Sequence, residues 1–164
     1  MVALTGPPPV AGERCHAGQA WEWDGVHFAL LHPLADDYDE TGKRANSMSC
    51  VLKVSTENRS VLLTGDIEAR DEKAIIERSA SQVRADVLLV PHHGSKTSSS
   101  DAFVKAIAPK AATISCAAGN QYKFPHEPTL KTLQKYNVEV YRTDRNGVIT
   151  ITTDGSSYSI EKEH

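Results

Sequence analysis

The sequence lacks any long hydrophobic run, although 40% of its 164 residues are hydrophobic. No apolar stretch approaches the roughly 18 residues that a membrane-spanning helix needs. The first ten residues, MVALTGPPPV, also lack the basic start and the apolar middle of a signal peptide. We therefore expect neither a membrane span nor a targeting segment in these residues.

Cysteine is scarce. Cys15, Cys50 and Cys116 are odd in number, lie far apart and form no CxxC pair. This spacing argues against a disulfide framework and against a structural zinc knuckle. We expect the three cysteines to be free, buried thiols.

An excess of positive charge is also missing, because the formal net charge is −3 and the pI is about 6.1. Nucleic-acid binding would therefore have to be local or mediated by a metal. The length and composition are typical of a single globular domain. Residues 1–18 are rich in proline and glycine and read as an extended leader, and residues 19–164 as the domain.

The most informative stretch runs from Val61 to Ser95 and contains two short apolar runs. The first, residues 61–63, stops at Thr-Gly-Asp, and the second, residues 87–90, stops at Pro-His-His-Gly-Ser. A helix-compatible segment of about a dozen residues separates them, as in a strand, helix, strand unit with parallel buried strands. The sequence thus predicts an α/β fold.

Because ligand sites in such sheets lie beyond the carboxyl ends of the strands, Asp66 should emerge beside His92 and His93. Carboxylates and imidazoles bind zinc, manganese or iron, and imidazole also transfers protons near neutral pH. Two structural alternatives stay open. Asp66 is also suited to cap the following helix, expected from Ile67 to about Ala80, and the two histidines to pack under a loop.

A third strand, residues 111–116, precedes a long turn that carries His126 between two prolines. The sequence therefore predicts that Asp66, the histidine pair and His126 converge although they are distant in the chain. The isolated His27 and His32 read as structural residues.

The remaining pattern is that of short strands joined by turns. We expect a hairpin around Asp24-Gly25, a charged surface loop and a second strand pair, then a helix preceded by a capping box of Ser98 and Asp101, a short helix and three closing strands. The expected residues are 20–31 for the hairpin, 35–46 for the loop, 49–63 for the strand pair, 102–108 and 130–136 for the two helices, and 139–142, 148–152 and 158–160 for the closing strands.

The sequence resembles the metallo-β-lactamase superfamily in its motif LLTGD, which is followed by DVLLVPHHGS, a strand and a histidine between prolines. More narrowly, it resembles the carboxyl-terminal domain of the ComEC/Rec2 family of competence DNA-uptake proteins. The resemblance implies an αββα sandwich, of which this chain matches the second half, with a mixed sheet and helices packed outside it.

The resemblance also implies a hydrolase with one or two divalent ions, zinc or manganese. Asp66 matches the family's bridging aspartate and His126 its late histidine ligand. The pair His92 and His93 matches the HHGS segment and supplies a ligand, for which we favour His93, or a proton donor. Which histidine has which role is left open. Gly94, Ser95 and Lys96 follow in this segment and are expected to bind the substrate.

By the same resemblance, the substrate is single-stranded or unwound DNA, and the reaction is metal-dependent cleavage of the strand that is not imported. The domain would be a soluble part of an inner-membrane channel protein, on the periplasmic or extracellular side. Two alternatives remain: a hydrolase of another ester or lactone, and a non-catalytic domain that binds DNA or the channel. Lys96, Lys105, Lys110, Lys123 and Lys131 fall near the expected rim of the site and are compatible with a local basic patch, although an ordinary solvated face is the favoured interpretation.

One family element is missing: the sequence contains no HxHxDH motif. The resemblance therefore covers about the second half of the family's fold, and we expect the chain to be a fragment of a longer protein. Zinc is poorly retained by fewer than three protein ligands. We therefore expect these residues alone to bind metal weakly and to lack nuclease activity.

Overall fold

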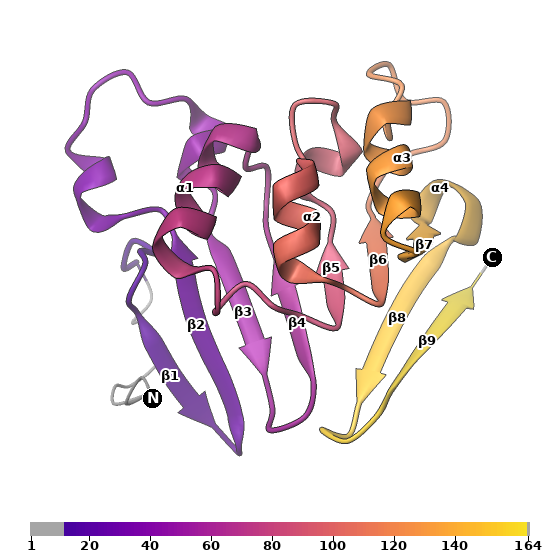
Figure 1. The fold of residues 1–164 in the computed structure, drawn as a ribbon, viewed down its shortest axis with the longest axis horizontal. Coiled ribbons are helices and arrows are strands. Elements are labelled where there is room, and N and C mark those ends of the chain that lie inside the picture. Colours follow the sequence, from indigo (N-terminus) through magenta and orange to yellow (C-terminus); the bar gives the residue numbers. More distant parts are fainter. Residues whose placement is uncertain (1–11, 164) are drawn as a thin grey trace.

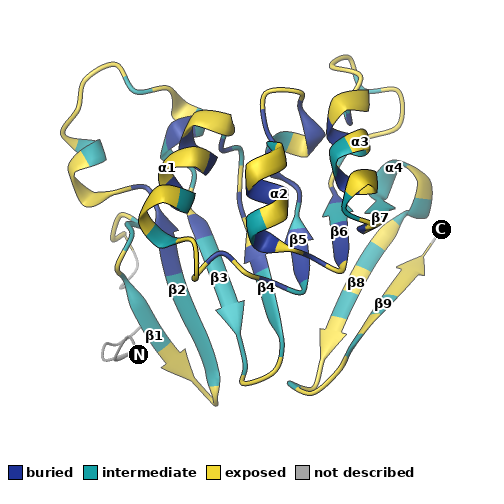
Figure 2. Ribbon diagram, in the orientation of Figure 1, coloured by how far each residue is buried: buried dark blue, intermediate teal, exposed yellow. Residues whose placement is uncertain are grey.

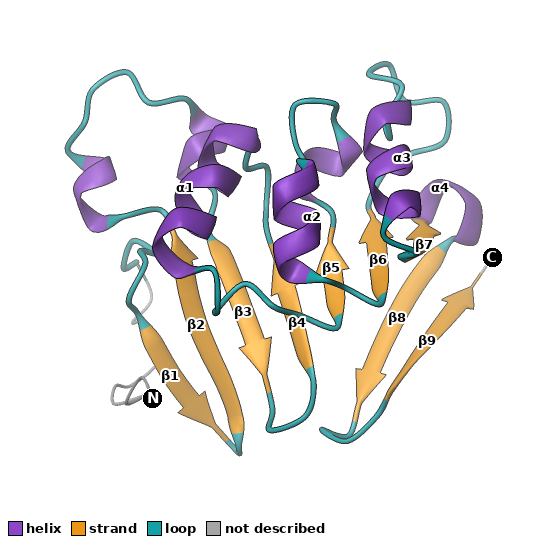
Figure 3. Ribbon diagram, in the orientation of Figure 1, coloured by secondary structure: helices purple, strands orange, loops and turns teal. Residues whose placement is uncertain are grey.

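The computed structural model describes residues 12–163, so residues 1–11 of the predicted leader lie outside the described part. Two sheets are present (Figures 1 and 3). The larger contains seven strands in chain order, and the smaller is the hairpin β8–β9. The strands are β1 Ala20–Trp23, β2 Val26–His32, β3 Val51–Ser55, β4 Ser60–Leu63, β5 Val87–Leu89, β6 Ala111–Ile114, β7 Glu139–Arg142, β8 Val148–Thr153 and β9 Tyr158–Glu163.

The larger sheet is mixed. Strands β1 to β4 pair antiparallel, whereas β4 to β7 pair parallel. Helices α1 (Ala69–Ser79), α2 (Asp101–Ile107) and α3 (Glu127–Lys135) cover one face of this sheet, and the short α4 (Thr143–Asn146) joins β7 to β8 (Figure 1). The predicted α/β class is confirmed, with its mixed sheet and outer helices.

None of the helices in residues 12–163 is both long and apolar enough to cross a membrane.

The core lies between the sheet and its helices (Figure 2). Because side chains alternate along a strand, Leu62, Leu88 and Ala112 point to the helix face, where they are fully buried. They belong to one buried cluster with Phe103 of α2 and Leu133 of α3. Burial of a side chain of this size stabilises a fold by about 1.5–3 kcal/mol. This core fixes the positions at which the parallel strands end.

Two helix starts differ from the sequence prediction. Helix α1 begins at Ala69, and its N-cap residue is Glu68, whose backbone N–H donates to Asp71. The alternative that Asp66 caps this helix is therefore wrong. Helix α2 is capped by Ser100, whose Oγ accepts from the Phe103 N–H, and not by the predicted Ser98.

The expectation of free thiols is wrong for two of the three cysteines. Cys15 and Cys50 form a disulfide with a Cα–Cα distance of 6.0 Å, while Cys116 is free. Cys50 lies directly before β3, and the backbone of residues 17 and 18 hydrogen-bonds to Pro33 and Leu30 at the end of β2. The pairing of β2 with β3 therefore brings together two cysteines 35 residues apart, which their spacing gave no reason to expect.

Reduction of this disulfide should destabilise the protein. A cross-link between residues this far apart lowers the conformational entropy of the unfolded chain, which raises its free energy by about 3–4 kcal/mol. We expect dithiothreitol to lower the free energy of unfolding by roughly this amount, measured by urea denaturation. A Cys15→Ala/Cys50→Ala variant serves as control, because it should be equally destabilised and insensitive to the reductant. Identical unfolding with and without reductant would contradict the expectation.

Candidate metal and proton-transfer site

The carboxyl ends of β4, β5 and β6 meet at one edge of the sheet, and the segments that follow them carry the predicted site residues (Figure 1). Asp66 follows β4 and His93 follows β5. The Asp66 Oδ1 lies 3.6 Å from the His93 Nε2, and both side chains are close to half exposed. The predicted meeting of the aspartate with the histidine pair therefore holds for His93.

The turn Pro91–Gly94 decides the directions of the two histidines. It is a short 3₁₀ turn in which His92 has φ +50° and His93 has φ +54°, the left-handed region that non-glycine residues seldom adopt. The His92 N–H donates to the Gly65 carbonyl (3.0 Å), and the Ser95 N–H to the His92 carbonyl (2.9 Å). Strained backbone held in this way is frequent at functional sites.

The tautomer of His93 follows from its second partner. Its Nδ1 lies 2.8 Å from the Ser115 carbonyl, which can only accept, so Nδ1 carries the proton. In the neutral form of the ring, Nε2 then has a lone pair on the side of Asp66. Metal-binding histidines in proteins usually have this arrangement, with one ring nitrogen donating to a carbonyl or carboxylate and the other binding the metal.

His92 has different partners and is less exposed, at 20% of its side chain. Its Nδ1 lies 3.4 Å from the Thr97 Oγ1 and 3.7 Å from the Glu68 Oε1. Its Nε2 lies 3.4 Å from the Asn46 Nδ2. The ring is thus held in a polar network, while its neighbour faces Asp66.

His126 is the N-cap residue of α3 and is tied to the histidine turn through the backbone. Its Nδ1 accepts from the Lys96 N–H (3.0 Å), and its own N–H donates to the Gly94 carbonyl (2.9 Å). A neutral imidazole that accepts at Nδ1 carries its proton on Nε2. In residues 12–163, no three His, Cys, Asp or Glu side chains form a metal-holding group, so His126 does not join Asp66 and His93 in such a cluster.

Sequence reasoning missed Phe124, which lies among the three histidines. Its ring centroid is 5.8 Å from that of His92, 6.2 Å from that of His93 and 5.1 Å from that of His126. The only sequence signal was an aromatic residue two positions before His126. Asn46, Glu68 and Ser115, which position the histidines, were missed as well.

Gly94 and Ser95 are buried and shape the turn. A Cβ on Gly94, at φ +80°, would lie 2.5 Å from the Pro125 Cβ. The Ser95 carbonyl accepts from the hydroxyls of Ser98 and Thr129. Lys96 is exposed at the rim.

The loop that carries Lys96 is anchored by a buried carboxylate. Glu72 of α1 is fully buried and accepts from the backbone N–H groups of Ser99 (2.5 Å) and Ser100 (2.8 Å). Burial raises the pKa of the Glu72 carboxyl, which its hydrogen bonds only partly offset. Helix α1 therefore fixes the loop after the histidines.

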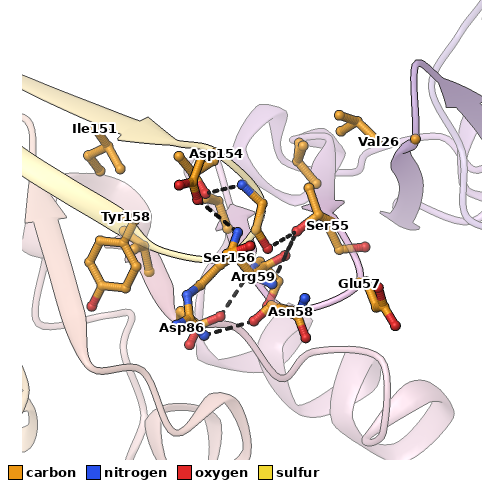
Figure 4. Close-up of a pocket in the computed structure, with 18 of the residues that line it drawn as sticks. Val26, Ser55, Glu57, Asn58, Arg59, Asp86, Ile151, Asp154, Ser156 and Tyr158 are labelled. Carbon is orange, nitrogen blue, oxygen red and sulfur yellow. Dashed lines mark hydrogen bonds between the residues drawn. The ribbon is translucent and has the colours of Figure 1, made fainter.

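A cavity of about 540 Å³ lies elsewhere. It is formed between the β3–β4 turn and the tip of the β8–β9 hairpin, and Arg59, Asp86 and Tyr158 are among its lining residues (Figure 4). Lys110 forms an ion pair with Asp86 here, and Lys105 lies in the last turn of α2, which runs away from the histidines. The alternative of a basic patch at the site therefore does not include these two lysines.

A methyl group on Gly94 should disturb the site. Gly94→Ala meets Pro125 and also strains the left-handed backbone, so we expect a loss of about 2–4 kcal/mol in unfolding free energy, measured by urea denaturation. Gly119→Ala is the matched control, because Gly119 also has positive φ (+67°) but nothing within 4 Å of an added Cβ. It should lose only about 1–2 kcal/mol. Equal losses in the two variants would show that the contact with Pro125 is unimportant.

Comparison with known protein families supplies the identity of this architecture. Residues 45–118, which contain Asp66 and the histidine turn, match the metallo-β-lactamase superfamily. Residues 45–118 of this chain therefore belong to the metallo-β-lactamase superfamily. Members of this superfamily generally bind divalent metal ions, often zinc.

Three curated relatives narrow the assignment. Recombination protein 2 of Haemophilus influenzae is 39% identical over 84% of this chain, and competence protein ComA of Neisseria gonorrhoeae is 35% identical over 84%. ComE operon protein 3 of Bacillus subtilis is 37% identical over 85%. The matches span 16%, 19% and 17% of these relatives, respectively, so this chain corresponds to a small part of each.

Proposed function

We propose that this chain supplies part of a metal-dependent hydrolase centre that cleaves DNA phosphodiesters during competence DNA uptake. The observation that carries the proposal is the pair Asp66 and His93, 3.6 Å apart at the exposed strand edge, with the His93 Nε2 left free by the bond from Nδ1 to Ser115. The similarity to a competence protein supports DNA as the substrate.

The two side chains suit a divalent ion. A carboxylate and an unprotonated imidazole nitrogen are ligands that zinc and manganese accept. When bound, the ion supplies Lewis-acid activation of water and of a phosphate oxygen. Asp66 contributes negative charge, and Ser115 keeps the His93 ring oriented. His126, whose Nδ1 accepts from the Lys96 N–H, presents a proton at Nε2 that it can donate to a leaving oxygen.

The Cys15–Cys50 disulfide supports an extracytoplasmic location of the domain. A disulfide such as Cys15–Cys50 forms and persists in oxidising compartments. The domain would therefore face the periplasmic or extracellular side, with the rest of a membrane channel protein as its partner and single-stranded or unwound DNA as its substrate.

Metal binding by the isolated chain tests the ligand pair. With two ligands only, we expect zinc and manganese to bind more weakly than micromolar, measured by isothermal titration calorimetry. Asp66→Asn and His93→Gln should each weaken zinc binding by about tenfold or more. His126→Gln should leave it unchanged, and so should His27→Gln, a control on β2 beside Glu22. Unchanged affinity in the first two variants would refute the ligand pair.

The reaction is tested in a longer protein. In Neisseria gonorrhoeae, the matched segment of competence protein ComA is replaced by the corresponding residues of this chain, and transformation by added DNA is scored. We expect the hybrid to be transformable, and Asp66→Asn or His93→Gln to reduce transformation about 100-fold. The His27→Gln hybrid should transform normally. If both site variants transform as well as this control, the proposed hydrolase function is wrong.

A further inference from the structure

An exposed aromatic stack extends the site beyond the histidines. Tyr122, in the loop between β6 and α3, is 62% exposed. Its ring stacks on that of Phe124, with centroids 5.4 Å apart and an interplanar angle of 20°. One face of Phe124 is thus covered by an aromatic ring that is itself open to solvent.

Phe124 connects this ring to the proposed metal ligand. The Phe124 and His93 rings are also nearly parallel, at 24° and 6.2 Å between centroids. Tyr122 therefore lies one ring away from His93, which faces Asp66. A group that stacks on Tyr122 would lie beside the proposed centre.

The loop is held by one side chain, Asn120. Its Oδ1 accepts from the Phe124 N–H (2.9 Å), and its Nδ2 donates to the carbonyls of Ala117 (2.9 Å) and Phe124 (2.8 Å). The Lys123 N–H also donates to the Asn120 carbonyl (3.0 Å). Tyr122 is therefore presented by a hydrogen-bonded loop, which lowers the entropy cost of binding to it.

The charges nearby suit a nucleic-acid backbone. Lys123 follows Tyr122 in the loop, and Lys96 lies where its backbone N–H reaches His126; both lysines are exposed. They provide local positive charge at this rim, although the chain as a whole is acidic. Proteins that bind single strands commonly combine such cations with aromatic rings on which bases stack.

We propose that Tyr122, backed by Phe124, is a stacking platform for one unpaired nucleobase of the substrate strand next to the Asp66–His93 centre. The inference rests on the function proposed above and specifies what the site recognises. Because both faces of a base in a duplex are covered by its neighbours, this platform favours single-stranded over double-stranded nucleic acid.

Fluorescence anisotropy with a labelled short oligothymidylate tests the platform in low salt without metal. Base stacking on an aromatic ring contributes about 1–3 kcal/mol, so Tyr122→Ala should weaken binding roughly 5- to 150-fold. Tyr122→Phe keeps the ring and should bind within about twofold of the unmodified protein. Trp23→Ala is the matched control, because Trp23 is also a largely exposed aromatic residue (71%) but lies on β1, so its loss should not affect binding.

An abasic oligonucleotide of the same length separates stacking from charge. The unmodified protein should bind it more weakly than oligothymidylate, and Tyr122→Ala should not weaken its binding further. The inference is overturned if Tyr122→Ala binds oligothymidylate normally, if it weakens binding of both oligonucleotides equally, or if the unmodified protein does not distinguish them.

The two proposals fail in different measurements. Tyr122 is not a metal ligand, so Tyr122→Ala should leave the zinc titration and the urea denaturation curve unchanged. If Tyr122→Ala has no effect on binding but zinc binding still depends on Asp66 and His93, only the stacking platform is refuted. If zinc binding does not depend on Asp66 and His93, the proposed hydrolase centre itself is refuted.

Discussion

The parallel register of β4, β5 and β6 is the constraint on which the site depends. Leu62 pairs with Leu88, and Leu88 with Ala112, so the three strands end within one residue of one another in the sheet register. Their buried side chains fix this register because a shift by one residue would turn them away from the helices. The segments that follow the strands then bring the His93 ring close to both Asp66 and Ser115. The geometry of the proposed site thus depends on packing in the core.

This origin explains which part of the site the sequence could predict. Buried apolar runs that stop at polar residues indicate parallel strands, and parallel strands deliver those residues to one edge. Asp66 and the histidine pair were accessible to this argument. The choice between His92 and His93 was not, because it depends on a left-handed 3₁₀ turn, whereas the alternation of side chains applies to an extended chain.

The remaining features depend on loops, whose paths the spacing of residues does not determine. Phe124 reaches the histidines because Asn120 folds the loop before α3 back on itself. Asn46 reaches His92 from a segment 46 residues earlier in the chain. The Cys15–Cys50 bond likewise depends on how residues before β1 run along β2. In each case the deciding contact is between segments with no periodic pattern.

The close approach of Gly94 to Pro125 couples two turns that lie about thirty residues apart in the chain. The His126 N–H reinforces this contact by donating to the Gly94 carbonyl. We therefore expect the histidine turn and the loop of Phe124 to open and close as one cooperative unit. Amide hydrogens on both sides of the contact would then exchange with solvent at a common rate, and the segments that carry His93 and Phe124 would become disordered together.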